Sequence, residues 1–320
     1  MSDIFIIPES KSDLWDKFIL NSSSPNIVNH SIILDNWGAK KFFIKKNQEI
    51  LAGFSLIKKE NKIIKLDENL LYTPIVYRLY KGIPISSIIN DKFLIIDALA
   101  DFLIKENFSG EMRFDHFTTD LRPFLWKNFD YKKKIFEVSD VKYTSLLNIS
   151  NLQIKDFENS KFFQNMSVRT RQSYRYSIKR KKYIVKELFD KKLIKKLVEI
   201  TFKRQKKRVD FDLEKHVNIL EKLHKKKLLA SYICEDDSGN VLSKVIFGLN
   251  GNYATFLNGA RSGKDFGNDY SMVYLLIYSF NELKNKNIYE VDLEGMNSPK
   301  RSFFKNGFGG NLIPYYTIKF

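Results

Sequence analysis

The second half of the chain changes its hydrophobic period several times, and each change marks a new element. A period of two residues, typical of a half-buried strand, runs through KKYIVKEL at 181–188. After Asp190, a residue type that favours helix N-termini, apolar residues recur at helical spacing over 191–205 and again over 213–223. The pattern therefore predicts a strand followed by two helices.

Three short apolar runs come next, at 228–235, 241–249 and 253–260. The turn sequences DDSGN and NGN separate them, which favours an antiparallel meander of three strands. The pattern then predicts a helix over 270–286, a strand over 288–294, a short helix near 301–308 and a last strand over 311–320.

The first half repeats this order more loosely. It predicts a helix near 11–20, strands at 40–46, 50–59 and 71–76, a helix over 91–106, a strand at 112–117, a short helix at 120–129 and a strand at 142–150. The stretch ISNLQIKDFENSKFF then turns from strand-like to polar and helical. We therefore expect two copies of one architecture, a module at 1–155 and a second module at 156–320.

Composition excludes a disordered chain and predicts a location. Hydrophobic residues make up 43% and aromatic residues 14% of the 320 positions, enough for two packed cores. The chain starts without a basic leader and apolar stretch, and Asp97 and Asp101 interrupt its most apolar segment. Its one cysteine, Cys234, fits a reducing compartment. These features predict a cytoplasmic protein with no transmembrane segment.

The net charge of +17 is concentrated in one region. Residues 1–160 hold 22 Lys and Arg against 21 Asp and Glu, whereas Arg169–Lys227 alone holds 22 against 7. Such a field attracts phosphate-rich partners such as RNA, a nucleotide-linked substrate or an anionic membrane. Simple solvation of two or three helices by lysine and arginine is the alternative.

Three segments carry a resemblance to a known family: SVRTRQSYRYSIKRKKYIV at 167–185, the long run 254–295, and SFFKNGFGGNLIPYY at 302–316. With the ending of the first module at 130–150, they make the chain, from about Lys41 to Phe320, resemble the Fem-type (FemAB-like) double-GNAT acyltransferases. The resemblance implies an α/β (α+β) fold of two tandem GNAT-like modules, each a mixed, mostly antiparallel sheet flanked by helices.

The resemblance also implies an activity. A protein of this family moves an acyl group, acetyl or aminoacyl, to an amine of a cell-envelope saccharide or peptidoglycan-type precursor. Direct attack by the amine needs no covalent enzyme intermediate, and the sequence offers no Ser-His-Asp arrangement. A cytoplasmic enzyme of this kind is expected to use a phosphate-bearing sugar or lipid-linked precursor and not DNA, and the inner face of the cell membrane is a second location open to it.

The acyl donor is left open by the loop before the predicted helix 270–286. In acetyl-CoA-binding GNAT proteins this loop is a glycine-rich turn that holds the pyrophosphate at a helix N-terminus. Here the glycines are further apart, and the donor-binding candidates are Arg261, Gly263, Lys264, Gly267 and Asn268. We expect no permanently bound cofactor, and acyl-CoA or aminoacyl-tRNA as co-substrate. The long coiled-coil arm of some tRNA-dependent relatives is absent.

The catalytic candidates are Asp292, Glu294 and Lys305. In GNAT folds the strand IYEVDLE splays from its neighbour to open the active site, so a carboxylate at its end can accept a proton from the incoming ammonium. Two residues apart on a strand, Asp292 and Glu294 would face the same side. Lys305 resembles the family's Phe-Lys position and would bind phosphate or the oxyanion. Structural ion pairing is the alternative role for the carboxylates.

Acceptor binding is assigned to a helix and to the last strand. Arg171 and Arg175 are four residues apart and would share a helical face suited to a diphosphate. Tyr315 on the last strand is the third candidate. The four histidines lack ligand-like spacing, so no metal is predicted. The competing reading is a non-catalytic GNAT-like module that binds RNA, tRNA included, or an anionic membrane through Arg169–Lys227.

Overall fold

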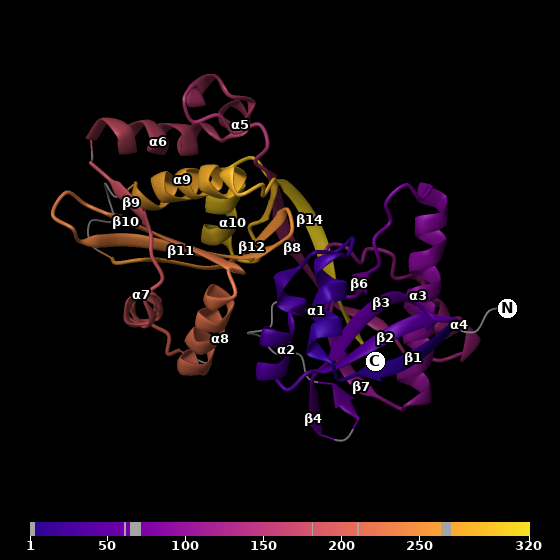
Figure 1. The fold of residues 1–320 in the computed structure, drawn as a ribbon. Coiled ribbons are helices and arrows are strands. Elements are labelled where there is room, and N and C mark those ends of the chain that lie inside the picture. The colour runs from indigo at the N-terminus through magenta and orange to yellow at the C-terminus, as the bar shows by residue number, and fades with distance from the viewer. Residues whose placement is uncertain (1–3, 61, 65–71, 181, 210, 264–269) are drawn as a thin grey trace. The chain divides into compact units, whose positions relative to one another are not determined.

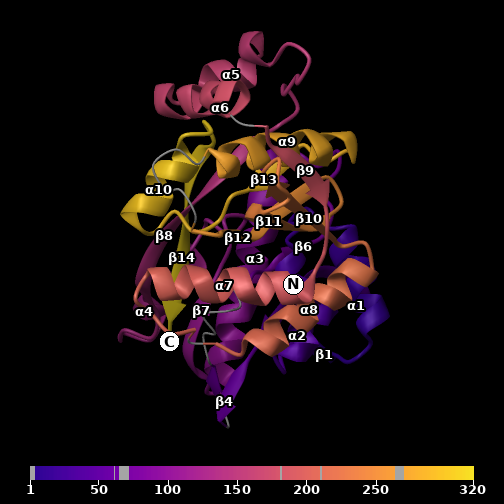
Figure 2. The ribbon, with the colours of Figure 1, turned by 90° about the vertical axis from the view of Figure 1, so that its left-hand side faces the viewer.

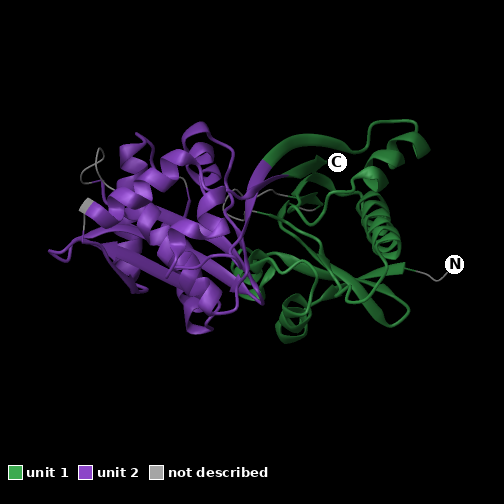
Figure 3. Cartoon of the chain, turned by 90° about the horizontal axis from the view of Figure 1, so that it is seen from above, with its two compact units in different colours: residues 1–142, 314–320 green, residues 143–313 purple. Residues whose placement is uncertain are grey.

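The structure is a computed structural model that describes residues 4–60, 62–64, 72–180, 182–209, 211–263 and 270–320. The chain forms two compact units, coloured separately in Figure 3. Unit 1 comprises residues 1–142 and 314–320, and unit 2 comprises 143–313. Both ends of the chain therefore belong to unit 1. This division differs from the expected boundary at 155/156, and the reason lies in two strands that cross between the units.

Unit 1 contains the expected elements in the expected order and adds several that were not predicted: β1 at its start, the short helix α2, and the short strands β4 and β5. Its elements are β1 Ile4–Glu9, α1 Ser12–Leu20, η1 Ile27–Asn29, α2 Ser31–Asn36, β2 Lys40–Lys46, β3 Glu49–Leu56, β4 Lys58–Glu60, β5 Ile63–Ile64, β6 Val76–Tyr77, α3 Ile85–Lys105, β7 Ser109–Arg113, α4 Arg122–Asp130 and the first half of β8 Glu137–Asn148. α3 begins six residues before the predicted helix start, because its first turns are exposed and carry no one-sided apolar pattern.

Unit 2 repeats the order. Its elements are η2 Phe157–Asn159, α5 Lys161–Asn165, α6 Val168–Arg180, β9 Ile184–Glu187, α7 Lys191–Arg204, α8 Leu213–Lys225, β10 Leu229–Glu235, β11 Val241–Asn250, β12 Tyr253–Arg261, α9 Ser271–Asn285, β13 Glu290–Asp292, α10 Pro299–Asn306 and the start of β14 Asn311–Lys319. The expected N-terminal cap of α7 is present, since the Asp190 carboxylate accepts a hydrogen bond of 2.9 Å from Leu193 N.

The strands β8 and β14 explain the unit boundary. Each closes its half of the chain in sequence order, but β13 of unit 2 pairs antiparallel with residues 146–148 of β8, and β7 of unit 1 pairs with residues 317–319 of β14. Each unit is thus completed by a strand segment from the far end of the other half. Hydrophobic periodicity marks a strand but not its partner, which is why the sequence placed the boundary after β8.

Unit 2 is a sheet covered by helices on both faces (Figures 1 and 2). Its strand order is β8-β13-β12-β11-β10-β9, antiparallel except for the β12–β13 pair. α9 packs on one face with α6 outside it, and α7 and α8 lie against the other. Phe280 and Leu276 of α9 join Phe247 and Val291 of the sheet in one buried core. This core fixes the ends of β12 and β13.

Unit 1 has its own core. A four-stranded antiparallel sheet, β1-β2-β3-β6, packs with α3, and Phe54, Leu99 and Phe124 are fully buried in the same cluster. The segment of β14 in unit 1 adds Ile318 to this cluster. Two separate cores agree with the two modules expected from chain length and apolar content.

Candidate active site

The β12–β13 pair contains the feature that defines the candidate site. The two strands run parallel through the three pairs Tyr253–Glu290, Ala254–Val291 and Thr255–Asp292, and the pairing ends there. β13 stops at Asp292, whereas β12 continues to Arg261 along β11. On the side of β12 that faces β13, the main-chain groups beyond Thr255 therefore have no partner in β13. We call the point where the β12–β13 pairing ends the strand split.

A β-bulge lies at the same point of β12. Ile246 pairs with Asn258 and Phe247 with Phe256, so Leu257 is an extra residue opposite β11. A bulge adds twist and bends its strand. The bulge thus helps to turn β12 away from β13 where the split begins.

Asp292 is a fully buried carboxylate that shapes the end of β13. Its Oδ1 accepts hydrogen bonds from the hydroxyl of Thr144 on β8 and from Glu294 N at 2.8 Å. Because Val291 belongs to the core under α9, Asp292 faces the other side of the sheet. These bonds anchor the turn after β13 and make Asp292 a positioning group in the structure.

The chain leaves β13 through two consecutive residues in the left-handed region, Glu294 at φ 48° and Gly295 at φ 58°. A non-glycine residue with positive φ is strained, and such strain is stored where the surrounding contacts hold it. The expectation that Asp292 and Glu294 share one side by strand alternation does not apply, because the strand has ended before Glu294.

Lys305 of α10 stabilises this turn through hydrogen bonds to its main chain. Its buried ammonium donates to the main-chain oxygens of Leu293 at 2.6 Å and Glu294 at 2.5 Å, and it lies 4.6 Å from the centre of the Phe256 ring. Burial lowers the pKa of Lys305, opposed by the negative charges of Glu294 and Asp292. The lysine therefore binds main-chain carbonyls in this structure, where the sequence had suggested a substrate phosphate or oxyanion.

Glu294 is a half-buried residue, whereas Asp292 is fully buried. Desolvation by the surrounding protein raises the pKa of the Glu294 carboxyl, and the positive charges of Lys305 and Arg301 partly offset that increase. A carboxylate with a raised pKa is a stronger base than an ordinary one, which makes Glu294 a candidate proton acceptor. The structure brings Asp292, Glu294 and Lys305 together and gives them different surroundings.

The candidate donor loop is only partly described. Arg261 ends β12, and Gly263 follows with φ 87°. Lys264, Gly267 and Asn268 lie outside the described residues. Helix α9 then begins at Ser271 with no side-chain cap on its first N–H groups, an end that favours negative charge.

Arg204, on the last turn of α7, was not singled out from the sequence. Its guanidinium donates to the main-chain oxygen of Arg261 at 3.5 Å. Burial and the charge of Arg261 lower the pKa of Arg204, so this end of β12 is electropositive. The only sequence signal for Arg204 was its membership of the basic region, which it shares with many solvated residues.

The acceptor candidates belong to different units. Arg171 and Arg175 share a face of α6 as predicted, since both lie over the Phe163 ring, at 5.9 and 5.3 Å. However, Arg175 already pairs with Glu158 at 2.7 Å. Tyr315 belongs to unit 1 and is buried edge-on against Tyr72, 5.1 Å between ring centres. That packing disagrees with a substrate-facing tyrosine, so we do not retain Tyr315 as an acceptor residue.

A buried lysine on β11 also went unnoticed in the sequence. Lys244 is 1% exposed, and its ammonium donates to Asn258 Oδ1, on the half of β12 beyond the split, at 2.7 Å. Burial lowers the pKa of Lys244 to about 7. Burial and the charge of Lys244 lower the pKa of His216 on α8 to about 4. In the sequence Lys244 is only a single charged residue within the mostly apolar run 241–249.

The described residues also bear on metal binding and on membrane crossing. No group of three or more His, Cys, Asp or Glu side chains there is arranged to hold a metal ion. No helix in the described part of the chain combines the length and apolar character that crossing a bilayer requires.

Comparison with known proteins rests on structure alone, because no family model and no curated protein matches the sequence. FemX superposes with a TM-score of 0.69 at 13% identity, covering 98% of this chain and 96% of FemX. L-PGS from Bacillus licheniformis gives 0.56 at 12% identity, covering 97% and 91%. A tandem GNAT protein from the clavulanic acid biosynthesis pathway gives 0.53 at 7% identity, covering 99% and 98%. Nearly full coverage on both sides confirms the expected fold: the chain has the same tandem arrangement of two GNAT-like modules as these structures.

Proposed function

We propose that the protein is an N-acyltransferase that moves an acetyl or aminoacyl group to an amine of a cell-envelope saccharide or peptidoglycan-type precursor. One observation carries the proposal: Glu294, whose carboxyl has a raised pKa, follows the strand split directly, and Asp292 and Lys305 hold its main chain there. FemX and a tandem GNAT protein share the fold, which supports this reaction class.

In this reaction the amine arrives as an ammonium and must lose a proton before its nitrogen attacks the acyl carbonyl carbon. Glu294 accepts that proton as a carboxylate. The nitrogen then forms the new C–N bond, and collapse of the tetrahedral intermediate breaks the bond to the donor. The leaving group is the thiolate of CoA or the ribose oxygen of tRNA, and it takes up the second proton, which the attacking nitrogen loses as the amide forms.

The main chain of β12 beyond Thr255 is the second part of the proposed machinery. Its groups on the β13 side are left without a strand partner by the split. Such main-chain N–H groups are suited to hold the acyl carbonyl oxygen as negative charge develops on it. Lys305 acts through the carbonyls of Leu293 and Glu294, so we assign it a positioning role.

The donor is proposed to bind between the N-terminus of α9 and the end of β12. Arg204 and Arg261 make this end electropositive, and a helix N-terminus favours phosphate. Both acyl-CoA and aminoacyl-tRNA carry phosphates there, so this chemistry supports either donor. The acceptor is proposed to be a phosphate-bearing sugar or lipid-linked precursor, which would place the enzyme in the cytoplasm, in part at the inner face of the membrane.

The donor is tested first by thermal unfolding with CoA, acetyl-CoA or aminoacyl-tRNA added separately. A ligand at 100 times its Kd stabilises the folded state by about 2.7 kcal/mol, which raises the Tm. An increase with the CoA compounds assigns acyl-CoA, and an increase with charged tRNA alone assigns the aminoacyl donor. No increase with any of the three contradicts the proposed donor site.

The catalytic assignment is tested with the stabilising donor and a panel of amino sugars and precursor peptides. Glu294→Gln should lower turnover by about a hundredfold or more while keeping the donor-induced increase in Tm. The wild-type rate should fall as pH is lowered through the raised pKa of Glu294, because a protonated carboxyl accepts no proton, and the variant should lack this limb. Glu290→Gln, which changes an exposed carboxyl at the start of β13, is the control. Equal effects of both substitutions would reject Glu294 as the base.

A further inference from the structure

Unit 1 exposes aromatic side chains at the end of α4 that its own core does not use. Phe129 is 78% exposed, and Trp126 and Tyr131 are each 49% exposed. Trp126 and Phe129 are three residues apart on the helix and so share a face. The Trp126 ring packs against α3, because its centre lies 5.4 Å from the centre of the Phe93 ring. Exposed aromatic clusters of this kind mark interaction sites.

Lysines follow the aromatic residues directly. The turn after α4 reads Tyr131-Lys132-Lys133-Lys134, with Lys132 in the left-handed region at φ 51°. Lys134 pairs with Glu137, whereas Lys132 and Lys133 are exposed and form no ion pair with the residues that the structure describes. We call Trp126, Phe129, Tyr131, Lys132 and Lys133 the aromatic-lysine surface.

The local charge around this surface is positive. Residues 122–134 contain five basic side chains and one acidic side chain, Asp130. Arg122 pairs with Asp120, and Lys127 pairs with Asp97 and Asp101 of α3. The charge available to a partner is therefore that of Lys132 and Lys133, which suits an anionic partner.

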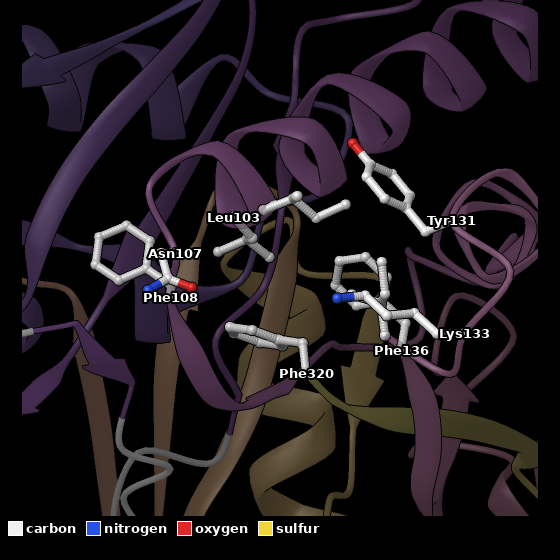
Figure 4. A pocket seen from close by; sticks show the side chains of 9 residues that line it. Leu103, Asn107, Phe108, Tyr131, Lys133, Phe136 and Phe320 are labelled. Carbon is white, nitrogen blue, oxygen red and sulfur yellow. The ribbon is translucent and has the colours of Figure 1, made fainter.

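A pocket of about 140 Å³ lies beside the same lysines (Figure 4). It is lined by Leu103, Ile104, Asn107, Phe108, Tyr131, Lys133, Ile135, Phe136 and Phe320. Tyr131 and Lys133 lie on one side of the pocket, and Asn107 and Phe108 lie on the other. This lining combines apolar side chains with a lysine, which suits a ligand that has both an apolar part and a negative charge.

We propose that the aromatic-lysine surface docks unit 1 on an anionic lipid bilayer. Tryptophan and tyrosine side chains sit at the headgroup level of membranes, where one end of the ring system is apolar and the other is wet. Lys132 and Lys133 meet the lipid phosphates, Phe129 enters the acyl region, and the pocket takes an apolar segment of one lipid. This surface is separate in the sequence from Arg169–Lys227, and the inference does not rest on the proposed acyl transfer.

The test is flotation of the full chain with vesicles of phosphatidylcholine alone and with vesicles in which about a third of the lipid is phosphatidylglycerol. The protein should float with the anionic vesicles and stay behind with the neutral ones. Trp126 emission should shift to the blue on binding, and a Trp126→Phe variant should bind with most of that shift removed, since Trp15 and Trp37 lie elsewhere in unit 1.

Two variants locate the surface. Lys132→Glu/Lys133→Glu should lower partitioning by roughly 30-fold or more, since each lysine near an anionic surface contributes about 1 kcal/mol, or about fivefold. Phe129→Ser should lower it by about tenfold through lost apolar burial. Both positions are exposed, so an unchanged Tm checks that the variants are folded.

The matched control is Lys206→Glu/Lys207→Glu in unit 2. These lysines are also consecutive and exposed after a helix, and Lys206 also has positive φ, at 56°. The control should keep most of the vesicle binding. Absence of binding to anionic vesicles overturns the proposal. It does so also if the surface proves to be a contact through which the chain self-associates in solution. An equal or larger loss in the control also overturns it, because binding then follows total charge or the Arg169–Lys227 region.

Discussion

The buried Lys244 allows a quantitative prediction about stability. Its ammonium has one hydrogen bond, to Asn258, and no carboxylate partner among the described residues. Burial lowers its pKa from 10.5 to about 7, and each pH unit corresponds to 1.36 kcal/mol. The cost of holding this side chain in the folded protein at and below pH 7 is therefore about 4–5 kcal/mol.

Lys244→Met removes that cost and keeps a side chain of similar length. The substitution also removes the hydrogen bond to Asn258, which is expected to cost about 1 kcal/mol. Unit 2 of the variant should therefore be more stable than that of the wild type by about 3–4 kcal/mol near pH 6.5.

The sign of the pH dependence follows from the two pKa values. Between pH 7 and 10.5 the unfolded chain holds a proton on Lys244 that the folded chain has released, so wild-type stability rises with pH in this window. The advantage of the variant should shrink accordingly, to about 1 kcal/mol at pH 9. His216, whose pKa is lowered to about 4, stays neutral throughout.

The assay must report on unit 2. All three tryptophans, Trp15, Trp37 and Trp126, lie in unit 1, whereas the single cysteine, Cys234, is buried in unit 2. Pulsed alkylation of Cys234 after equilibration in urea at each pH therefore follows unfolding of unit 2. Lys226→Met, at an exposed position, is the control and should change stability by less than about 0.5 kcal/mol at any pH.

Two outcomes would refute the reasoning. If Lys244→Met is less stable than the wild type at pH 6.5, the ammonium is compensated by a partner and burial costs little. If the difference between the two proteins is the same at pH 6.5 and pH 9, the proton on Lys244 does not change on unfolding in this range.

Three further substitutions are expected to destabilise unit 2, each read from the urea midpoint of Cys234 alkylation. Lys305→Met leaves two main-chain carbonyls without their donor and should cost about 3 kcal/mol; an unchanged midpoint would mean that the carbonyls find other donors. Gly295→Ala places a Cβ at φ 58° and 3.3 Å from the Lys305 ammonium, and should cost about 1–2 kcal/mol; no loss would show that the turn relaxes. Asp190→Ala removes the α7 cap and should cost about 1 kcal/mol, whereas Asp190→Asn, which keeps an acceptor, should cost less.

Several features of the fold were predictable because they depend on near neighbours in the chain. The Asp190 cap, the meander β10–β12 and helix α9 follow from residues within a few positions of one another. Hydrophobic period and turn composition act over this distance. Helix α3 shows the limit, since Ile85 is 77% exposed and its helical turn leaves no one-sided apolar pattern.

The sequence by itself determined two modules of one order, their helices and strands, and the carboxylate-rich end of the strand that became β13. Tertiary structure alone decided which strand completes each unit, since β8 and β14 cross between them. It also decided that Asp292 is fully buried, that Glu294 is half-buried with a raised pKa, and that Lys305 binds main-chain carbonyls of the turn. The physical reason is distance along the chain: burial, strand pairing and pKa depend on residues more than 100 positions apart, such as Thr144 and Asp292, and local periodicity contains no information about them.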